Sequence, residues 1–526
     1  MKHLICLSAV VLTMVFGVTT IQSQEQPRPL KLSVLLEEDV YPVPAPDNGA
    51  GPTWCYGSTT LVRVGPEVFL TELAVEPSAK PLNNCRWRLL KRYANPAWFS
   101  LLSHYSGDAK SALTSDSDAI NSWQCLFSDD ANRTREPSPM AVFPDTGEIF
   151  VSANPTLVTD LEKYSGPARP EVVPFRVTYK EIELTYGGLG RTSPGTARFP
   201  NGVEKQETLL PAWNGEPQFT EHSYRSFAAD GVHRELILFQ NIGYTHAEWA
   251  FYDRSGNWSA TGQLAWPFGA EYAKPCPIRT CYPTVALVDR KAYFCGVSDI
   301  VEPNPEWAAY KKELTGRDWD YDFRRLFFTW TNDIGNEDFQ PWVEVSSREK
   351  TCGWIMPNDL YVAPDESVHL LWSERAIDTR LREKFFPDEK QSEALCHAVI
   401  RDGKIVQRNE VMIRHENEVK PVASTGRFHV TPDGRLWVVY YVSGREIDAA
   451  TGERKSISEN RIMEIKNGEP TGDFQTIPLT TPFSSFFTAT VRAGNAPSAV
   501  LDLHGTCPNS NQLRYAAVEL TNEKRE

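Results

Sequence analysis

Tyrosine, histidine, arginine and glutamate residues recur just upstream of short apolar segments, and such side chains are typical of acid–base chemistry on an anionic ligand. A guanidinium group binds a carboxylate or sulfate through two parallel hydrogen bonds, while a phenol or imidazole transfers protons or attacks as a nucleophile. The candidate catalytic residues are Tyr282, His222 and Glu136. The candidate substrate-binding residues are Arg135, Arg225, Arg427, Tyr224, Tyr56, Trp354 and Asn358.

The arginines would change the acidity of the neighbouring phenols. A phenol near guanidinium groups has its pKa lowered because the phenolate is stabilised, so Tyr282 or Tyr224 could serve as a base or nucleophile. His222 is the alternative base, and Glu136 would be the acidic partner. A structural interpretation stays open, in which the arginines pair with acids such as Glu136 or Glu221 and the tyrosine hydroxyls donate to carbonyls.

The sequence lacks the motifs typical of metal and cofactor sites, so we expect neither a metal nor a cofactor. The sequence has no C-x-x-C pair, no histidine pair with ligand spacing, and no G-x-S-x-G, H-E-x-x-H or P-loop motif. The acidic run 318–322 could hold calcium, but a solvated loop is the favoured interpretation. We therefore expect a site built from protein side chains alone.

The elements that must position these residues are seven β-hairpins. Each is an alternating apolar stretch, a turn often written Pro-Asp-x or Asp-Gly, and a second apolar stretch. They start at Thr59, Met140, Ser226, Thr284, Asp359, Arg427 and Phe487. Hairpins recurring at tens of residues predict an all-β fold, a seven-bladed β-propeller in which each hairpin supplies the two innermost strands of a blade. A pair of β-sandwiches is the alternative.

The propeller geometry also decides which residues meet. Residues just before the innermost strands converge at one mouth of the central channel, so the candidate residues from different blades would face one another there. Two insertions, residues 304–315 and 379–386, carry helix signals, with Asn304 before Pro305 and with Pro387 ending the second. We expect both as helices projecting from the propeller surface.

Length and composition fit one large exported domain. The 526 residues are 41% hydrophobic and 23% charged, and the net charge of −14 argues against a nucleic-acid or anionic-membrane partner. Residues 1–23 have the charged start, short apolar stretch and small-residue exit of a signal peptide, which predicts a secreted or periplasmic protein. Residues 24–526 would form a single propeller domain, which we expect to be a monomer.

Export permits disulfide bonds. Loss of Cys6 with the leader leaves nine of the ten cysteines, so at least one thiol would be unpaired. Cys276 and Cys281 are the best local candidates for a disulfide, and buried, unreactive thiols are the interpretation for several others.

Two turns resemble the Asp-box (BNR) repeats of sialidase-like β-propellers. They are residues 118–123 (Asp-Ala-Ile-Asn-Ser-Trp) and 253–258 (Asp-Arg-Ser-Gly-Asn-Trp), which depart from the repeat at its glycine position, where Ile120 and Ser255 stand. In such a turn the aspartate accepts hydrogen bonds from backbone N–H groups, and the tryptophan packs between strands. The resemblance implies the propeller fold and, by itself, no particular activity.

Propellers of this type suggest two chemistries. Sialidase-like hydrolases use a tyrosine nucleophile with an acidic partner and an arginine cluster on the substrate carboxylate. Ulvan lyases, which look similar in outline, use arginine to neutralise a uronate and tyrosine or histidine to remove its C5 proton. The expected fold, the signal peptide, the many aromatic residues and the candidate arginine, tyrosine, histidine and glutamate residues together favour an exported propeller that acts on acidic carbohydrate by hydrolysis or β-elimination. The alternative is a non-catalytic propeller that binds a glycan or a protein; a deep mouth favours catalysis, and a flat or plugged mouth favours binding.

Overall fold

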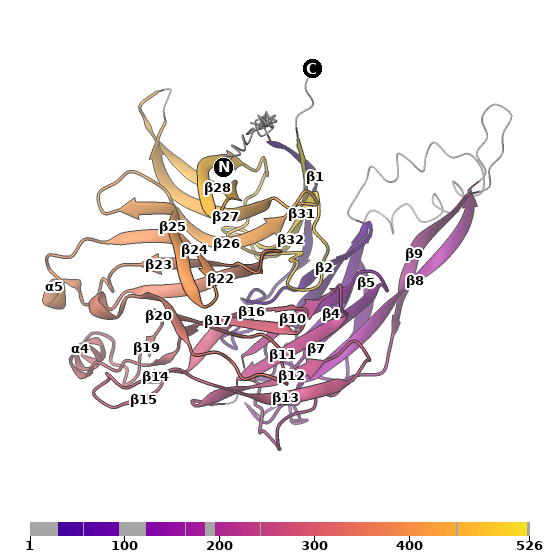
Figure 1. The fold of residues 1–526 in the computed structure, drawn as a ribbon, viewed down its shortest axis with the longest axis horizontal. Helices are drawn as coiled ribbons and strands as arrows, with labels where there is room; N and C mark the ends of the chain where they lie inside the picture. The colour runs from indigo at the N-terminus through magenta and orange to yellow at the C-terminus, as the bar shows by residue number, and fades with distance from the viewer. Residues whose placement is uncertain are drawn as a thin grey trace, which may run out of the picture.

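The chain folds into seven antiparallel sheets of four strands each (Figure 1). The computed structural model describes residues 30–55, 57–93, 123–163, 165–184, 195–222, 224–241, 243–448 and 451–522. Strands dominate these residues because apolar and polar side chains alternate along them and short turns separate them.

Each sheet is one blade, in which the strands follow one another from the innermost to the outermost. Blade 1 contains β2 (Leu61–Val64), β3 (Glu67–Val75), β4 (Cys85–Tyr93) and β5 (Gln124–Ser128), and blade 2 contains β6 (Met140–Phe143), β7 (Glu148–Ala153), β8 (Glu171–Leu184) and β9 (Gly195–Lys205). Blade 3 contains β10 (Arg225–Asp230), β11 (Glu235–Asn241), β12 (His246–Tyr252) and β13 (Trp258–Ala265), and blade 4 contains β16 (Thr280–Val288), β17 (Lys291–Ser298), β20 (Arg325–Thr331) and β21 (Val343–Ser347).

The remaining three blades follow the same order. Blade 5 contains β22 (Trp354–Val362), β23 (Val368–Arg375), β24 (Ser392–Arg401) and β25 (Lys404–His415), and blade 6 contains β26 (Val422–Val430), β27 (Leu436–Ile447), β28 (Arg454–Lys466) and β29 (Glu469–Thr476). Blade 7 contains β30 (Ser485–Thr488), β31 (Val500–Thr506), β32 (Gln512–Asn522) and, as its outermost strand, β1 (Leu30–Pro42).

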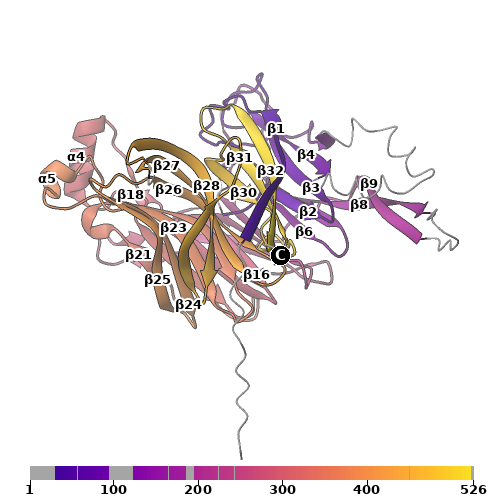
Figure 2. The same ribbon diagram turned by 90° about the horizontal axis from the view of Figure 1, so that it is seen from above.

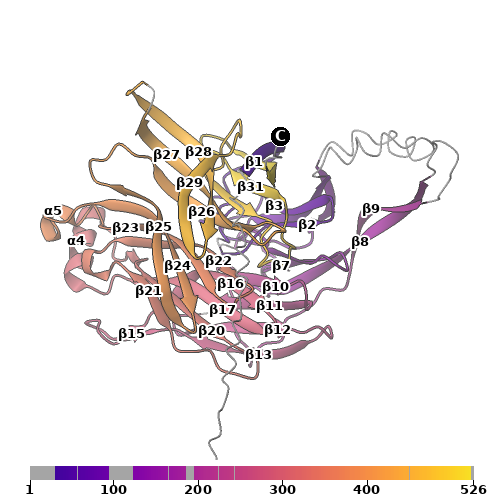
Figure 3. The same cartoon turned by 45° about the horizontal axis from the view of Figure 1, so that its top comes forward.

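The innermost strands form a closed ring. The first strand of each blade contacts the first strand of the next, from β2 through β6, β10, β16, β22 and β26 to β30 and back to β2. Figures 1 and 3 place β10 and β16 near the middle and β13 at the edge. All seven predicted hairpins supply the two innermost strands of their blades. The predicted seven-bladed β-propeller is therefore confirmed, and the pair of sandwiches is excluded.

The two ends of the chain close the ring together. β1 pairs antiparallel with β32, so the N-terminal strand becomes the outer edge of the C-terminal blade. This pairing joins the first and last parts of the chain through backbone hydrogen bonds, which protects the ring from opening at that blade.

Apolar layers between blades hold the ring together. All seven residues of β11 are buried, and Phe239 of β11 meets Phe294 of β17 edge-on at 5.2 Å between blades 3 and 4. The same alternation in every hairpin buries one face against each neighbouring blade. Figure 2 shows β8 and β9 extending as a long hairpin beyond blade 2.

In the part of the chain that the structure describes, two α-helices and two short two-stranded sheets lie between the blade strands. They are α4 (Pro305–Thr315), α5 (Arg382–Phe385), β14 (Phe268–Gly269) with β15 (Cys276–Pro277), and β18 (Ile300–Val301) with β19 (Tyr321–Asp322). Asn304 caps α4 by accepting from two backbone N–H groups of its first turn. Trp307 of α4 meets Phe386 at 5.5 Å, so the two inserts pack against each other. Both predicted helices are confirmed, although α5 is shorter than predicted. None of the helices in the described chain is long and apolar enough to cross a membrane.

Candidate active site

An axial segment, residues 53–55 and 57–60 immediately before β2, crosses the ring of innermost strands. Its Ser58 Oγ accepts from the backbone N–H of Phe227 in β10 at 3.0 Å. Its Thr59 Oγ1 donates to the carbonyl of Thr488 in β30 at 2.9 Å. Because these partners belong to well-separated blades, the axial segment must occupy the centre of the ring.

Gly57 is the tightest point of the axial segment. A Cβ atom there would lie 1.7 Å from the Pro283 carbonyl oxygen and 2.7 Å from Thr284 Cα. The backbone of β16 therefore approaches so closely that only glycine fits.

A second segment, residues 489–498 after β30, reaches the centre of the same ring. Its Arg492 donates from Nε to Asp359 Oδ1 of β22 at 3.0 Å and from Nη1 to the carbonyls of Gly57 at 2.7 Å and Val285 at 2.9 Å. The two segments thus meet on the axis and plug the central channel.

Aromatic rings gather where the axial segment meets β10 and β16. The hydroxyl oxygens of Tyr224 and Tyr282 lie 3.2 Å apart, so one hydroxyl donates to the other. Trp54 meets Tyr282 edge-on at 5.6 Å and stacks on Tyr224 at 6.5 Å. The His222 ring lies 5.0 Å from Tyr224, and Phe323 lies 5.7 Å from Tyr282. The structure therefore brings Tyr224, Tyr282 and His222 into one cluster, which we call the mouth cluster.

Glu136 lies beside the mouth cluster. Its Oε1 is 3.7 Å from His222 Nδ1, an ion-pair distance rather than a hydrogen bond. Its side chain is 4% exposed, whereas that of His222 is 40% exposed. Among the described residues, neither of these two atoms has a hydrogen-bond partner. A proton on Nδ1 would face the carboxylate, which would leave Nε2 as the unprotonated nitrogen of His222.

The backbone is strained at Tyr282. Its φ of 49° is left-handed, and the pairing of β16 with β17 shifts register between Cys281 and Thr284. A left-handed conformation at a non-glycine residue costs about 1–3 kcal/mol and clusters at functional sites. The irregularity also re-aims the side chain out of the regular alternation of the strand, which places its hydroxyl against that of Tyr224.

The pKa of the Tyr224 phenol is shifted in the direction opposite to the one expected from the sequence. Burial raises its pKa well above the ordinary value, and the neighbouring Tyr282 hydroxyl raises it further. The prediction that guanidinium groups lower this pKa is therefore wrong for Tyr224. The physical reason is that aromatic rings surround the hydroxyl and disfavour a phenolate. A tyrosine held in this way stays protonated at neutral pH and can donate its proton only to a strongly basic oxygen, such as a departing alkoxide.

The three predicted arginines are buried and donate to backbone carbonyl groups of other segments. Burial lowers the pKa of Arg225. These bonds favour a structural role, joining neighbouring segments, over the predicted contact with a ligand. The bonds are Arg225 to Ser152 at 2.9 Å and to Pro137 at 3.0 Å, Arg427 to Phe486 at 3.1 Å and to Asn358, and Arg135 to Asn48 at 2.9 Å.

Trp354 and Asn358 line a different pocket. This pocket of about 280 Å³ contains residues of blades 5 and 6 and none of the mouth cluster. The Asn358 amide donates to Ser373 Oγ at 2.8 Å and its carbonyl oxygen accepts from the Gly426 N–H at 3.2 Å, so both ends of the amide are bonded within the protein. Tyr56 lies outside the described residues.

Sequence reasoning missed Arg279 and Phe323. β16 begins at Thr280, four residues before the hairpin pattern starts, so the residues immediately upstream of that pattern reach back only to Cys281. Starting from the true strand end would have included Arg279. Phe323 belongs to an insertion and carries no sequence signal of its place beside Tyr282.

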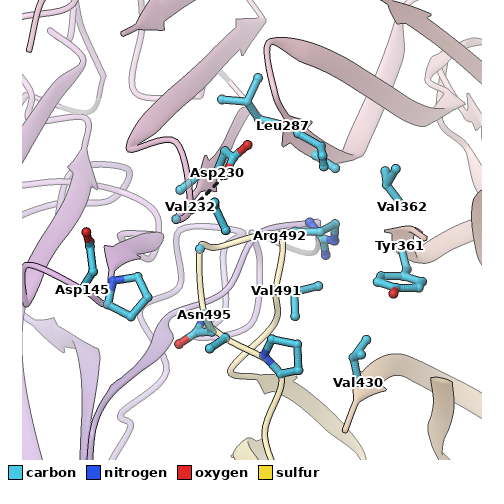
Figure 4. A pocket seen from close by; sticks show the side chains of 18 residues that line it. Asp145, Asp230, Val232, Leu287, Tyr361, Val362, Val430, Val491, Arg492 and Asn495 are labelled. Atoms are coloured by element: carbon cyan, nitrogen blue, oxygen red, sulfur yellow. Dashed lines mark hydrogen bonds between the residues drawn. The ribbon is translucent and has the colours of Figure 1, made fainter. Parts of the chain in front are cut away.

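A larger cavity lies at the ends of β10, β16, β22 and β26, at the opposite mouth. Its volume is about 500 Å³, and Figure 4 shows Val232, Val362, Val430 and Val491 among its lining residues. The carboxylate of Asp230, also in its wall, accepts from three backbone N–H groups and faces His233 at 2.7 Å. The charged groups here are bonded within the protein, and the mouth cluster remains the better candidate for chemistry.

The cysteines are free thiols. All nine cysteines of the described chain are unpaired, so the predicted disulfide between Cys276 and Cys281 is absent. Cys281 is buried in β16, where its Sγ lies 3.5 Å from the Asn241 amide, whereas Cys276 is half-buried in a separate hairpin. The two side chains therefore belong to different sheets.

The acidic run 318–322 is neutralised within the protein. Asp320 lies 3.1 Å from Lys311 and 2.8 Å from Arg380. The described residues contain no group of three or more potential ligands that could hold a metal ion. Lys311 and Arg380 of the two helical inserts therefore neutralise the carboxylate that a calcium ion would need as a ligand.

The Asp253 turn has the hydrogen bonds expected from its sequence. Asp253 Oδ1 accepts from the backbone N–H of Ser255 at 2.9 Å and of Asn257 at 3.3 Å, and the Trp258 ring lies 5.3 Å from Tyr252. In the first such turn, residues 118–122 lie outside the described residues.

Comparisons with known proteins concern the fold. No family model matches the chain, and no curated protein matches it. Among solved structures, the chain is similar to an ulvan lyase bound to -[GlcA(1-4)Rha3S]-, with 8% identity over 92% of this chain and 94% of that chain and a TM-score of 0.45. It is also similar to Trypanosoma rangeli sialidase (9% identity, 73% and 51% covered, TM-score 0.34) and to an endo-arabinase from Bacteroides thetaiotaomicron (11%, 57% and 94%, 0.28). At such identities the similarity gives no activity for this chain.

Proposed function

We propose that this propeller acts on acidic carbohydrate and cleaves it by β-elimination at the mouth cluster. The observation that carries the proposal is the pairing of a half-exposed histidine with a buried carboxylate, directly beside two hydrogen-bonded tyrosine hydroxyls. His222 and Glu136 supply a base, and Tyr224 and Tyr282 supply an acid. Export to the periplasm or the exterior, proposed from residues 1–23, belongs to the same proposal.

The reaction uses each group once. Nε2 of His222 takes the proton from C5 of a uronate, and the electron pair of that bond forms a double bond between C5 and C4. The bond from C4 to the glycosidic oxygen breaks, and that oxygen takes a proton from one tyrosine hydroxyl of the pair. Glu136 stabilises the imidazolium formed, and the second hydroxyl donates to the new phenolate. Solvent then returns the proton from His222 to the tyrosine.

Elimination fits the site better than sialidase-like hydrolysis. A nucleophilic tyrosine requires a lowered pKa, but burial raises the pKa of Tyr224. A protonated phenol and a basic histidine are instead the pair that an elimination uses.

The test is a screen of the purified protein against uronate, sialylated and sulfated glycans. Both new reducing ends and the absorbance of a new double bond are measured. We expect reducing ends and unsaturation to rise together on a uronate polymer, and His222→Gln to abolish both. His415→Gln, which alters an exposed histidine of blade 5, is the matched control and should retain activity. Reducing ends without unsaturation would indicate hydrolysis instead.

A second candidate function is non-catalytic glycan binding. One observation favours it: the axial segment and residues 489–498 plug the channel, and a plugged mouth suits binding. The screen separates the two functions, because a binding propeller would retain an acidic glycan on a column without producing either new end group.

A further inference from the structure

A continuous row of aromatic rings leads outward from the mouth cluster. Phe323 lies 5.7 Å from Tyr282, Tyr321 lies 6.3 Å from Phe323, and Trp319 lies 6.0 Å from Tyr321. Three ring-to-ring steps of about 6 Å therefore join the proposed reaction site to the surface.

The outer end of this row is unusually exposed. Trp319, between α4 and β19, is 57% exposed, and Tyr244, in the turn between β11 and β12, is 60% exposed. Exposed clusters of large aromatic residues mark binding surfaces, because leaving them in water is unfavourable. Tyrosine and tryptophan also combine a flat apolar face with a polar edge, which suits the C–H face and hydroxyl rim of a sugar ring.

Arg279 holds the two tyrosines in place. Its guanidinium lies 4.6 Å from the Tyr244 ring and 5.7 Å from the Tyr321 ring. Asp299 fixes the guanidinium by accepting from Nη2 at 2.8 Å through its side chain and from Nε at 3.0 Å through its carbonyl. The rings are therefore preorganised, which reduces the entropy lost when a ligand stacks on them.

The charges around the row are paired. Asp299 is paired with Arg279, and Asp318 is paired with Lys312. Neither carboxylate therefore stands unpaired against an acidic ligand lying across the rings.

We propose that Tyr244, Trp319 and Tyr321 form an aromatic platform that binds the sugar rings adjoining the bond to be cleaved. The substrate is therefore a polymer, because a single sugar cannot contact both Tyr282 and Trp319. This inference rests on the proposed function, since it extends the same site, but binding and turnover test the two separately.

The experiment measures affinity and turnover with uronate oligosaccharides of two to ten sugars prepared from ulvan, pectate, alginate and hyaluronan. For the best-bound series, Trp319→Ala should weaken binding of the long members about five- to tenfold and leave the disaccharide unchanged. Tyr244→Ala should act in the same direction. Phe474→Ala is the matched control, because Phe474 is also exposed and stacked under an arginine, at 4.0 Å, but lies on the outer strand of blade 6.

The outcomes distinguish the two proposals. Suppose that turnover depends on His222 but that Trp319→Ala binds oligosaccharides of every length as tightly as the unaltered protein. This result would overturn the platform and leave the proposed function standing. Length-dependent binding that Trp319→Ala weakens, without turnover of any glycan, would support the platform and overturn the lyase proposal. An unaltered protein that binds none of the oligosaccharides, or variants that weaken the disaccharide as much as the decasaccharide, would also overturn the platform.

Discussion

Arg492 and Asp359 form a buried ion pair on the axis of the propeller, with Nε of the arginine 3.0 Å from Oδ1 of the aspartate. The other oxygen of Asp359 accepts from the Phe428 N–H in blade 6 at 2.8 Å. Arg492 also donates to Gly57 of the axial segment. One ion pair therefore connects blades 5 and 6 with both segments that plug the channel.

Removal of this arginine should destabilise the whole fold. Arg492→Ala leaves the buried Asp359 carboxylate without its charge partner, and we expect the free energy of unfolding to fall by about 3–5 kcal/mol. Arg401→Ala is the control, because its ion pair with Asp365 is about half-exposed and should contribute less than about 1 kcal/mol. Urea unfolding followed by tryptophan fluorescence measures both. Equal effects of the two variants would show that the axial pair has no special role.

Gly57 provides a steric test of the plug. Gly57→Ala forces a methyl group into the Pro283 carbonyl, so the axial segment or β16 must move, and we expect a loss of at least about 2 kcal/mol. At Gly51, six residues earlier, an added Cβ meets no atom within 4 Å, and Gly51→Ala should be tolerated. The thermal midpoints of the two variants make the comparison. A Gly57→Ala protein as stable as Gly51→Ala would place the axial segment elsewhere.

The fold was predictable from sequence because every blade repeats the same local signal. Alternation and turn residues around Met140 or Asp359 are properties of adjacent residues, and seven repeats leave only a closed ring as a simple arrangement. The pairing of β1 with β32 carried no such signal, since it joins residues nearly 500 positions apart.

The candidate site was predictable only in part. Position before or at the start of an innermost strand brought Tyr224, Tyr282 and His222 together, because the ring geometry enforces their convergence. The same rule could not tell where a side chain points, and so it treated the buried Arg225 as a ligand contact. The direction of a buried side chain depends on which carbonyl groups remain unsatisfied in neighbouring blades, and that is a tertiary property.

Four buried histidines should make the protein sensitive to acid. Burial lowers the pKa of His369, His429 and His504 to about 4 and that of His397 to about 3, against about 6.5 in an unfolded chain. As pH falls below 6.5 the unfolded chain takes up protons that the folded chain does not, so stability present above pH 6.5 is lost toward pH 4. Each such proton contributes about 1.4 kcal/mol per pH unit. Asp322, whose pKa burial raises to about 8, acts in the opposite direction, as do Glu72, Glu171 and Glu235, whose pKa burial also raises.

Urea unfolding midpoints between pH 7 and pH 4.5 measure this dependence. We expect a steady fall, and His504→Gln should make the fall shallower. His415→Gln, at an exposed position, should leave the slope unchanged. A midpoint that stays constant over this range would contradict the assignment of neutral, buried histidines.

Thiol titration tests both the free cysteines and the proposed leader. In denaturant, a chain without disulfides should give nine reactive thiols if residues 1–23 are removed and ten if Cys6 is retained. The folded protein should react rapidly at Cys125, which is exposed, and slowly at the buried thiols, because burial raises the pKa of groups such as Cys295 to about 12. A count of seven in the chain without its leader, or of eight in the chain that retains Cys6, would show that a disulfide forms.

Tyr282→Phe tests the acid in the proposed elimination. The substitution removes one hydroxyl and its 3.2 Å contact with Tyr224 but keeps the ring that packs on Trp54, so the fold should lose no more than about 1.5 kcal/mol. Turnover should fall by about 10²–10⁴-fold, the usual contribution of a positioned proton donor, while glycan binding changes little. Tyr252→Phe, at the end of β12 and outside the mouth cluster, is the control and should retain full turnover. A Tyr282→Phe protein that still forms the unsaturated product at the normal rate would show that the proton reaches the leaving oxygen from another group.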